Sequence, residues 1–290
     1  MTVARGTPDD EVRELPPETQ EVLRHLAEEH GVDLREYRPA TIQRRMELRY
    51  AATGARHAGE YLRRLRADAA ETARLLSCLL IPVTSFFRDP AVFQALRATV
   101  LPELVARAGP RRLVRAWVVG CATGEEAWSL AMLLTEACAH ARAPGFHVLA
   151  TDLDANVLAT ARAGRYPALS GLPDEERARH FRPLPGGFEV AEALRSRVQF
   201  AQHDVLGHAL APQQAIIASF DLVMCRNVLI YFAPRLQQKA LERMAAVMEP
   251  RGALVLGLAE SVKRGTERLV RPHPAVDPGL KIFQRVAEAG

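Results

Sequence analysis

The chain is 290 residues long, with 48% hydrophobic and 25% charged residues and a formal charge of +4. This composition is ordinary for a globular protein and allows one large domain and one small one. There is no apolar run long enough to cross a bilayer, residues 1–10 lack the apolar core of a signal peptide, and the cysteines show no Cys-x-x-Cys spacing. We therefore expect a cytoplasmic protein with reduced cysteines, no bound metal and no direct membrane insertion.

The N-terminal part has a helical pattern. Residues 1–16 are polar and contain prolines, which predicts a flexible N-terminus. Apolar side chains then recur at helical spacing over residues 17–80, where we expect a small helical domain. Its predicted helices lie within 17–30, 41–50, 60–65 and 71–80. Residues 81–110 are predicted to form a linker and a further helix.

The second predicted helix carries a group of arginines. Helical spacing places Ile42, Met46 and Arg49 close to one side, and Arg44, Arg45 and Arg49 are expected to lie largely off the core. Nearly all basic charge in the chain is arginine, whose planar guanidinium forms paired hydrogen bonds with carboxylates and phosphates. The three arginines are therefore either an ordinary solvated face or a contact for an acidic partner.

From residue 111 onward, strand-like apolar runs alternate with helical segments. The runs cover 112–119, 146–152, 198–200, 220–225 and 253–257, and the helices cover 125–140, 155–163 and 234–248. This alternation predicts an α/β domain over 111–290 with a parallel sheet and right-handed crossovers. Between about residues 166 and 197 the alternation stops. There Gly186-Gly187 separates two short strand-like pieces, which predicts a small inserted β-subdomain with a hairpin.

Ligands of doubly wound sheets bind beyond the carboxyl ends of the strands. The first strand leads into Gly120-Cys121-Ala122-Thr123-Gly124-Glu125-Glu126, whose small residues let the backbone approach a ligand at a helix N-terminus. The segment is neither Gly-x-Gly-x-x-Gly nor a P-loop. Glu125 and Glu126 would repel a pyrophosphate and suit a ligand with an ammonium group and hydroxyls. Acids in this position also simply complement a helix dipole.

Acids follow the next two strands as well. Asp152 ends the second strand, where a carboxylate can accept hydrogen bonds from both hydroxyls of a ribose. Asp154 is interpreted as the N-cap of the following helix. Asp204 follows the third strand and is a candidate acceptor for an adenine amino group, although aspartate is also common in loops.

The fourth strand leads into Cys225-Arg226-Asn227-Val228-Leu229-Ile230-Tyr231-Phe232. Buried arginine and asparagine need partners, so Arg226 and Asn227 are either pinned structurally or face a ligand. Adenine methyltransferases carry Asn-Pro-Pro-Tyr here, and its absence argues against a nucleic-acid substrate. Ahead of the first strand, Thr84 and Arg88 are four residues apart, so a helical turn would place both on one face.

Together with Thr84-Ser85-Phe86-Phe87-Arg88-Asp89, Thr151-Asp152-Leu153-Asp154 and Gly257-Leu258-Ala259-Glu260-Ser261, these motifs resemble the CheR family, the S-adenosylmethionine (SAM):protein-glutamate O-methyltransferases of bacterial chemotaxis. The resemblance covers nearly the whole chain after the first fifteen or so residues. It implies a Rossmann-like class I SAM-dependent methyltransferase sheet with a small inserted β-subdomain and an N-terminal all-helical domain. It also implies SAM as donor, S-adenosylhomocysteine (SAH) as product, and chemoreceptor glutamates as acceptors.

The resemblance assigns roles to individual positions. The cofactor contacts that it implies are Thr84, Arg88, Glu126, Asp152, Asp204, Val205, Arg226 and Asn227. Among them, Glu126 matches a contact to the methionine end, Asp152 a contact to the ribose, and Asp204 with Val205 a pair beside the adenine.

Two further roles concern the methyl acceptor. Arg88 and Tyr231 match the residues that position the reacting carboxylate. Arg44, Arg45 and Arg49 are the expected contact to the cytoplasmic helices of a chemoreceptor.

The chain departs from the family pattern in two places. Pro82 stands where the family often has an asparagine that touches the cofactor, so that contact is not expected here. The predicted hairpin, from Phe181 to Val198, is several residues shorter than in members that bind a C-terminal pentapeptide of the receptor. We therefore expect methylation without this pentapeptide tether, by a monomeric enzyme.

The implied chemistry needs no general base, because a glutamate carboxylate with an ordinary pKa near ~4.3 is already ionised at neutral pH. Positioning of a cationic donor against an anionic acceptor in a water-poor site should supply most of the catalysis. Two alternatives stay open: a SAM-dependent methyltransferase with another substrate, and a regulatory module that binds SAM or SAH and signals to a partner. A nicotinamide dehydrogenase is disfavoured by the missing glycine fingerprint.

Overall fold

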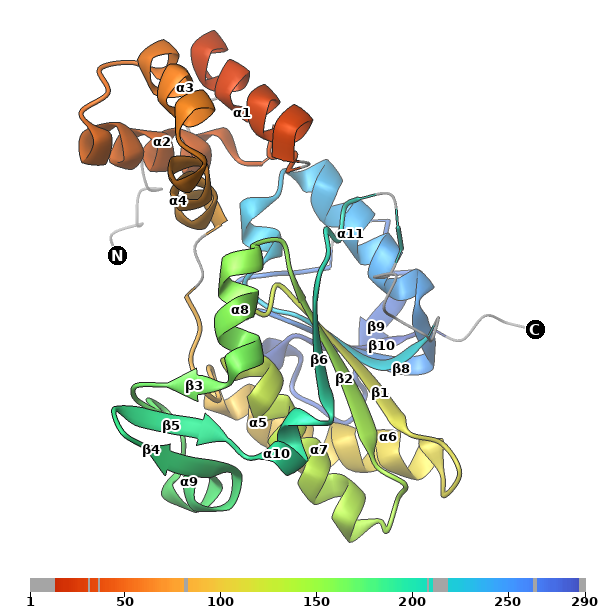
Figure 1. Cartoon of the computed structure of the whole chain (residues 1–290). Helices are drawn as coiled ribbons and strands as arrows, with labels where there is room; N and C mark the ends of the chain where they lie inside the picture. The colour runs from red at the N-terminus through yellow and green to blue at the C-terminus, as the bar shows by residue number, and fades with distance from the viewer. Residues whose placement is uncertain are drawn as a thin grey trace, which may run out of the picture. The chain divides into compact units, whose positions relative to one another are not determined.

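The computed structural model (Figure 1) divides into two compact units, which we call the helical unit and the sheet unit. The helical unit is Met1–Ile81 with Tyr231–Leu236, and the sheet unit is Pro82–Ile230 with Gln237–Gly290. The residues that the structure describes are 14–30, 32–35, 37–80, 83–207, 209–210, 219–262 and 265–286. Pro82 and most of the predicted N-terminal segment lie outside them.

The helical unit packs amphipathic helices against one another, as the spacing of its apolar residues predicts. Its helices are α1 (Pro17–His30), α2 (Pro39–Thr53), α3 (Ala58–Ala67) and α4 (Ala69–Leu80). Gly54 ends α2 in the left-handed conformation, with a φ of 73° that favours glycine. The core consists of fully buried apolar side chains, among them Leu23, Leu26, Ile42, Met46, Tyr61 and Leu75.

Arg49 of α2 differs from the sequence-based expectation. Its guanidinium donates to both carboxylate oxygens of the buried Glu71, at 2.6 and 2.7 Å, and the Tyr61 hydroxyl donates to the same carboxylate at 2.7 Å. Positions 42, 46 and 49 lie on one side of a helix, so Arg49 points with the core residues. The prediction that it lies off the core is therefore wrong. Arg44 is exposed and Arg45 half-buried.

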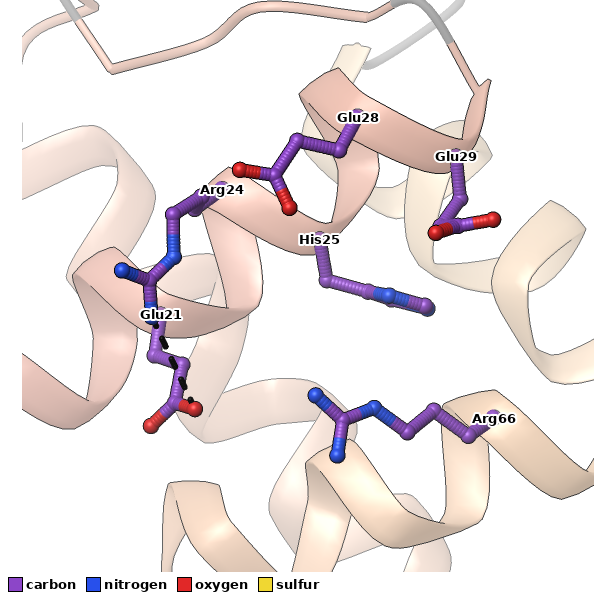
Figure 2. A pocket seen from close by; sticks show the side chains of 6 residues that line it. All are labelled: Glu21, Arg24, His25, Glu28, Glu29 and Arg66. Carbon is purple, nitrogen blue, oxygen red and sulfur yellow. Dashed lines mark ion pairs between the residues drawn. The ribbon is translucent and has the colours of Figure 1, made fainter.

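A surface hollow of about 520 Å³ lies on the helical unit (Figure 2). Figure 2 shows Arg66 of α3 pointing toward the side chains of α1, where Arg24 forms an ion pair with Glu21 at 3.7 Å. The lining mixes acids and bases: Glu21, Arg24, His25, Glu28, Glu29 and Arg66. A lining of mixed sign does not select a charged ligand, so we do not assign this hollow a function.

The sheet unit is built on a sheet with the order β6-β2-β1-β7-β8-β10-β9, which has seven strands within the described residues. The strands from β6 to β8 are parallel, and β10 and β9 add antiparallel pairs at one edge. The strand bounds are β1 (Val114–Val119), β2 (Phe146–Asp152), β6 (Val198–Gln202), β7 (Phe220–Cys225), β8 (Met248–Leu256), β9 (Val270–Pro272) and β10 (Ile282–Arg285). The α/β fold class that alternation predicts is confirmed.

Helices connect and cover these strands. Residues 90–108 form a continuous helical stretch whose middle turn is a π-helix, η2 (Leu96–Val100). The other elements are α5 (Pro90–Ala95), α6 (Leu101–Ala108), α7 (Glu125–His140), α8 (Ala155–Ala163), α11 (Pro234–Ala246), and the 3-10 turns η3 (Leu229–Tyr231) and η4 (Pro278–Leu280). Buried apolar side chains of α5 to α8 and the central strands form one core. Within the described ranges, none of the helices is both long and apolar enough to span a membrane.

The sequence-based bounds hold for α7 and α8 but not at the end of α11. The predicted helix extends to Met248, whereas Met248 already begins β8. Met248 pairs with Phe220 of β7, and a register irregularity follows before the regular pairing resumes. Because Met248 is buried and apolar, helical periodicity does not separate it from the preceding helix.

A small second sheet interrupts the alternation, as the sequence predicts. Strands β3 (Arg165–Tyr166), β4 (Phe181–Leu184) and β5 (Gly187–Val190) pair in the order β3-β5-β4 beside α8 and α10 (Figure 1). Short helices α9 (Asp174–His180) and α10 (Glu192–Arg195) flank it. Gly187 allows the close approach of β3, because a Cβ there would lie 2.3 Å from the Tyr166 carbonyl oxygen.

Candidate active site

The carboxyl ends of four parallel strands meet at one edge of the sheet. Strands β1, β2, β6 and β7 end at Val119, Asp152, Gln202 and Cys225. Predicted ligand contacts lie at or directly after each of these four ends, whereas the segment with Thr84 and Arg88 lies ahead of β1. In an open α/β sheet this is the edge where ligands bind.

The segment after β1 is a tight backbone loop that needs small residues. Gly120, Ala122 and Gly124 have φ values of 66°, 48° and 99°. A Cβ on Gly124 would lie 2.9 Å from the Ala161 Cβ of α8, and one on Gly120 would lie 2.5 Å from Val228. The glycines thus let the loop pack between α8 and the segment after β7, and they place the start of α7 at the strand ends.

Asp152 holds this loop from the end of β2. Its carboxylate accepts hydrogen bonds from the Ala122 N–H at 2.8 Å and from the Asp154 N–H at 3.0 Å. Burial raises the pKa of the Asp152 carboxyl above its ordinary value. Asp154 accepts from the Asn156 N–H at 2.8 Å and caps α8, as predicted.

Arg226 joins three separate segments. It donates to Glu126 Oε2 and to Asp89 Oδ2, both at 2.7 Å, and to the Arg88 carbonyl oxygen at 2.8 Å. Its side chain is 0% exposed, and its guanidinium carbon lies 5.4 Å from the ring centre of Phe93. Of the two alternatives that the sequence leaves open, the structure shows Arg226 pinned by protein partners.

Glu126 is the acidic partner of Arg226 at the start of α7. It is 8% exposed, and burial raises the pKa of its carboxyl, although the neighbouring Arg226 acts in the opposite direction. Arg226 donates to Oε2 of this carboxylate, so within the described ranges Oε1 is the oxygen that faces no such donor and could accept from a cationic ligand. Glu125 instead accepts from the Thr123 hydroxyl at 2.6 Å.

The segment that carries Thr84 and Arg88 is not helical. Residues 83–89 form coil, turn and bend, and Phe87 and Asp89 take positive φ values of 48° and 59°. The Phe87 N–H donates to Ser129 Oγ of α7 at 3.0 Å, and Arg88 donates to the Val83 carbonyl at 3.0 Å. The segment therefore does not form the helical turn that would place Thr84 and Arg88 on one face. The helix begins only at Pro90, because the chain first anchors on α7 and Arg226.

Asn227 lies after β7 in the left-handed conformation, with a φ of 60°. Its Oδ1 is buried and has no hydrogen-bond partner within the described residues. Its backbone N–H donates to Glu260 Oε2 at 3.1 Å. An unsatisfied buried acceptor at the carboxyl edge of a parallel sheet fits a donor supplied by a ligand.

Asp204 and Val205 follow β6. Asp204 Oδ1 accepts from the Leu206 N–H at 2.8 Å, which closes a short turn, and the Val205 side chain is buried. The Val205 carbonyl accepts from Arg243 of α11 at 2.6 Å. The pair thus stands at a strand end where the sequence predicts an adenine neighbour, and that role remains a prediction.

Tyr231 ends η3 and belongs to the helical unit. The Arg38 N–H donates to its carbonyl oxygen at 3.0 Å, and the next residue, Phe232, packs edge-on against Tyr37 with ring centres 5.0 Å apart. The sequence predicts residues 231–236 as part of the large domain, whereas they cluster with the helical unit.

The residues at the strand ends fit SAM. The donor carries an ammonium group, two ribose hydroxyls and an adenine amino group, all of which donate hydrogen bonds. The site offers acceptors of matching chemistry in Glu126, Asp152 and the unpaired Asn227 Oδ1. Asp89 and Glu260 also organise this edge and were not among the predicted site residues. Their motifs were noted, but only the fold reveals their partners.

An open, mainly parallel sheet of this order with carboxylates at its strand ends defines the class I SAM-dependent methyltransferases. The family model described as CheR methyltransferase, SAM binding domain, matches residues 82–274, and the model described as CheR methyltransferase, all-alpha domain, matches residues 17–80. The chain belongs to the CheR methyltransferase family.

Of three relatives with similar sequences, two carry names that agree with this assignment. An uncharacterized 104.1 kDa protein of Rhodobacter capsulatus is 38% identical over 234 residues, which cover 80% of this chain and 24% of that protein. The chemotaxis protein methyltransferase Cher2 of Pseudomonas putida is 31% identical, with 80% of this chain and 86% of the relative covered. Chemotaxis protein methyltransferase 1 of Pseudomonas aeruginosa is 34% identical, with 72% and 77% covered. The chain spans only about a quarter of the Rhodobacter relative and most of the other two.

Proposed function

We propose that this chain transfers the methyl group of SAM to glutamate carboxylates of chemoreceptors and forms glutamate methyl esters. The observation that carries the proposal is a pair of carboxylates in a member of the CheR family: the buried Glu126 at the start of α7 and the half-buried Asp152 at the end of β2. Two relatives of which the chain covers 86% and 77% are named chemotaxis protein methyltransferases. We propose that the reaction takes place in the cytoplasm.

In this proposal each group of residues has one task. Bound SAM supplies a methyl group on a positively charged sulfur. Glu126 Oε1 would bind its ammonium group, Asp152 the ribose hydroxyls, and Asp204 with Val205 the adenine, while Thr84, Arg88 and Asn227 complete the contact. Arg226 holds Glu126 in place.

The acceptor carboxylate needs orientation rather than deprotonation, because it is already ionised at neutral pH. Arg88 and Tyr231 would aim it at the methyl group, Arg88 by charge and Tyr231 by its hydroxyl. Protein dipoles and charges that replace water around two opposite charges supply the rate enhancement.

A methyl-transfer assay tests the proposal directly. The full-length protein is incubated with methyl-labelled SAM and a cytoplasmic chemoreceptor fragment. We expect label in the receptor that is released as methanol by base, as a carboxyl methyl ester requires. Calorimetry with SAH supplies the second measurement. Absence of SAH binding by folded protein would refute the cofactor site, and SAH binding without base-labile label would favour a regulatory module.

The affinity for SAH is expected to fall as the pH is lowered from 7 to 5. Burial raises the pKa of both Glu126 and Asp152, so they take up protons at a higher pH than ordinary carboxyls and lose the negative charge that binds the ligand. The loss is at most about tenfold per pH unit for each proton. The folding stability of the ligand-free protein has the opposite pH dependence. A carboxyl whose pKa is raised in the folded state makes folding more favourable as the pH falls. Calorimetric titrations across this range would reject the assignment if affinity were constant.

The exposed Arg44 and the half-buried Arg45 of α2 are the proposed receptor contact. With Arg49 bound to Glu71, this face consists of Arg44 and Arg45. We expect Arg45→Glu to raise the KM for receptor at least about tenfold at low salt, since it replaces attraction by repulsion for an acidic partner. SAH affinity should not change. Arg63→Glu on α3 gives the same charge change as a control, and equal effects of both variants would exclude a specific contact.

The short hairpin β4–β5 supports a tether-independent enzyme, and we propose separately that it acts as a monomer. Its turn lies between Leu184 and Gly187. We expect no measurable binding of a free receptor C-terminal pentapeptide at micromolar concentrations. Tight binding in a calorimetric titration would refute this part of the proposal alone.

A further inference from the structure

The carboxylate of Glu260 accepts hydrogen bonds from two segments of the candidate site, the one after β7 and the one after β8. Glu260 is 5% exposed and follows β8 in a tight turn, in which its own N–H donates to the Gly257 carbonyl at 2.9 Å. Its Oε1 accepts from the backbone N–H groups of Leu229 at 2.7 Å and Ile230 at 3.3 Å. Its Oε2 accepts from the N–H groups of Gly257 at 2.6 Å and Asn227 at 3.1 Å.

These bonds act on a segment that regular structure does not hold. β7 ends at Cys225, and residues 226–228 lie between it and the η3 turn at Leu229. Asn227 has a positive φ, which costs energy and persists only where other contacts fix it. A buried carboxylate that accepts four N–H bonds is such a contact, since charge-assisted hydrogen bonds are stronger than neutral ones.

The four N–H hydrogen bonds that Glu260 accepts, which we call the Glu260 clamp, leave room only for glycine at position 257. A Cβ there would lie 2.8 Å from both the Asn227 backbone nitrogen and Glu260 Oε2. Gly257 and Glu260 therefore form one unit with Asn227, and a methyl group at 257 would disturb the unit without changing any charge.

We infer that Glu260 is a positioning residue for methyl transfer, which sets the backbone of residues 227–230 and thereby the placement of Asn227. The inference rests on the proposed function. It adds a residue that touches neither donor nor acceptor and acts through four backbone N–H groups. Glu260→Gln keeps the shape but replaces one acceptor oxygen by an NH2 group, which faces N–H donors and leaves two of them unpaired.

The test measures single-turnover methyl transfer and SAH affinity in wild type, Glu260→Gln and Gly257→Ala. We expect both variants to lose about 100-fold in transfer rate, as small misplacements of reacting groups do, and less than tenfold in SAH affinity, because Glu126 and Asp152 stand on other strands. The two effects should not add in the double variant, since both disrupt the Glu260 clamp. Glu267→Gln, which removes an exposed carboxylate that accepts from the Gly265 N–H, is the matched control and should be unchanged.

The outcomes separate the two claims. An inactive wild type refutes the proposed function. An active wild type with variants of unchanged rate refutes the positioning role, as does an equal loss of SAH affinity and rate, which would mean general support of the cleft. If Glu260→Gln does not fold, Gly257→Ala carries the test with the charge intact.

Discussion

Replacement of Arg226 by methionine is expected to lower the free energy of unfolding by about 3–5 kcal/mol, because it leaves Glu126 and Asp89 without the cation that they share. The side chain of Glu126 is only 10% exposed, so water cannot substitute for the lost partner. SAH affinity should fall at least about tenfold, since Glu126 then either protonates or turns away. Chemical denaturation gives the first quantity and calorimetry the second.

A surface ion pair provides the matched control for this variant. Arg179 and Glu175 are 2.7 Å apart with side chains 52% and 79% exposed, and Arg179→Met should cost less than about 1 kcal/mol. If Arg226→Met does not fold, Arg226→Lys takes its place in the test. Lysine keeps the positive charge, but its ammonium group cannot reproduce the planar geometry with which the guanidinium reaches three acceptors. If both Arg226 variants lowered the free energy of unfolding by less than about 1 kcal/mol, Arg226 would not be the residue that holds the segments of the site together.

Replacement of Tyr231 by phenylalanine is expected to lower the turnover number about 100-fold and to leave SAH affinity unchanged. In the proposed function, the Tyr231 hydroxyl orients the acceptor carboxylate, and the loss of one well-placed donor at a reacting anion typically costs this much. Steady-state kinetics with a receptor fragment, at saturating SAM, measure the turnover number. Calorimetry with SAH measures the affinity.

Tyr37→Phe is the control for Tyr231→Phe. It also removes one hydroxyl from a tyrosine of the helical unit, and the ring that packs against Phe232 remains. Its turnover should equal that of wild type. Wild-type turnover in Tyr231→Phe would remove Tyr231 from the mechanism, and a parallel loss of SAH affinity would reassign it to cofactor binding.

The local features of the fold could be predicted from the sequence because each rests on neighbouring residues. The bounds of α7 and α8 follow from a glycine loop or an aspartate cap before the helix and helical periodicity within it. Asp152 could be named because it ends a strand, and strand ends of a parallel sheet share one edge. The inserted hairpin follows from Gly186-Gly187 between short strands.

Where a local rule competed with a distant partner, the sequence pattern did not predict what the structure shows. Thr84 and Arg88 have helical spacing, but the chain there bonds Ser129 and Arg226 instead of forming a turn of helix. Arg49 looks like a surface residue, but it faces the carboxylate of Glu71. In both cases a buried polar group needed a partner that sequence spacing does not encode.

The sequence by itself determined the fold class, the family and the acids at the strand ends, because these depend on periodicity and on residue order. Only the tertiary structure decided how the site is held. Arg226 meets partners 100 and 137 positions away in the chain, and Glu260 meets its η3 partners 30 and 31 positions away. Such pairs form because buried charges must be satisfied wherever folding brings them together, and no local pattern records which charge will meet which.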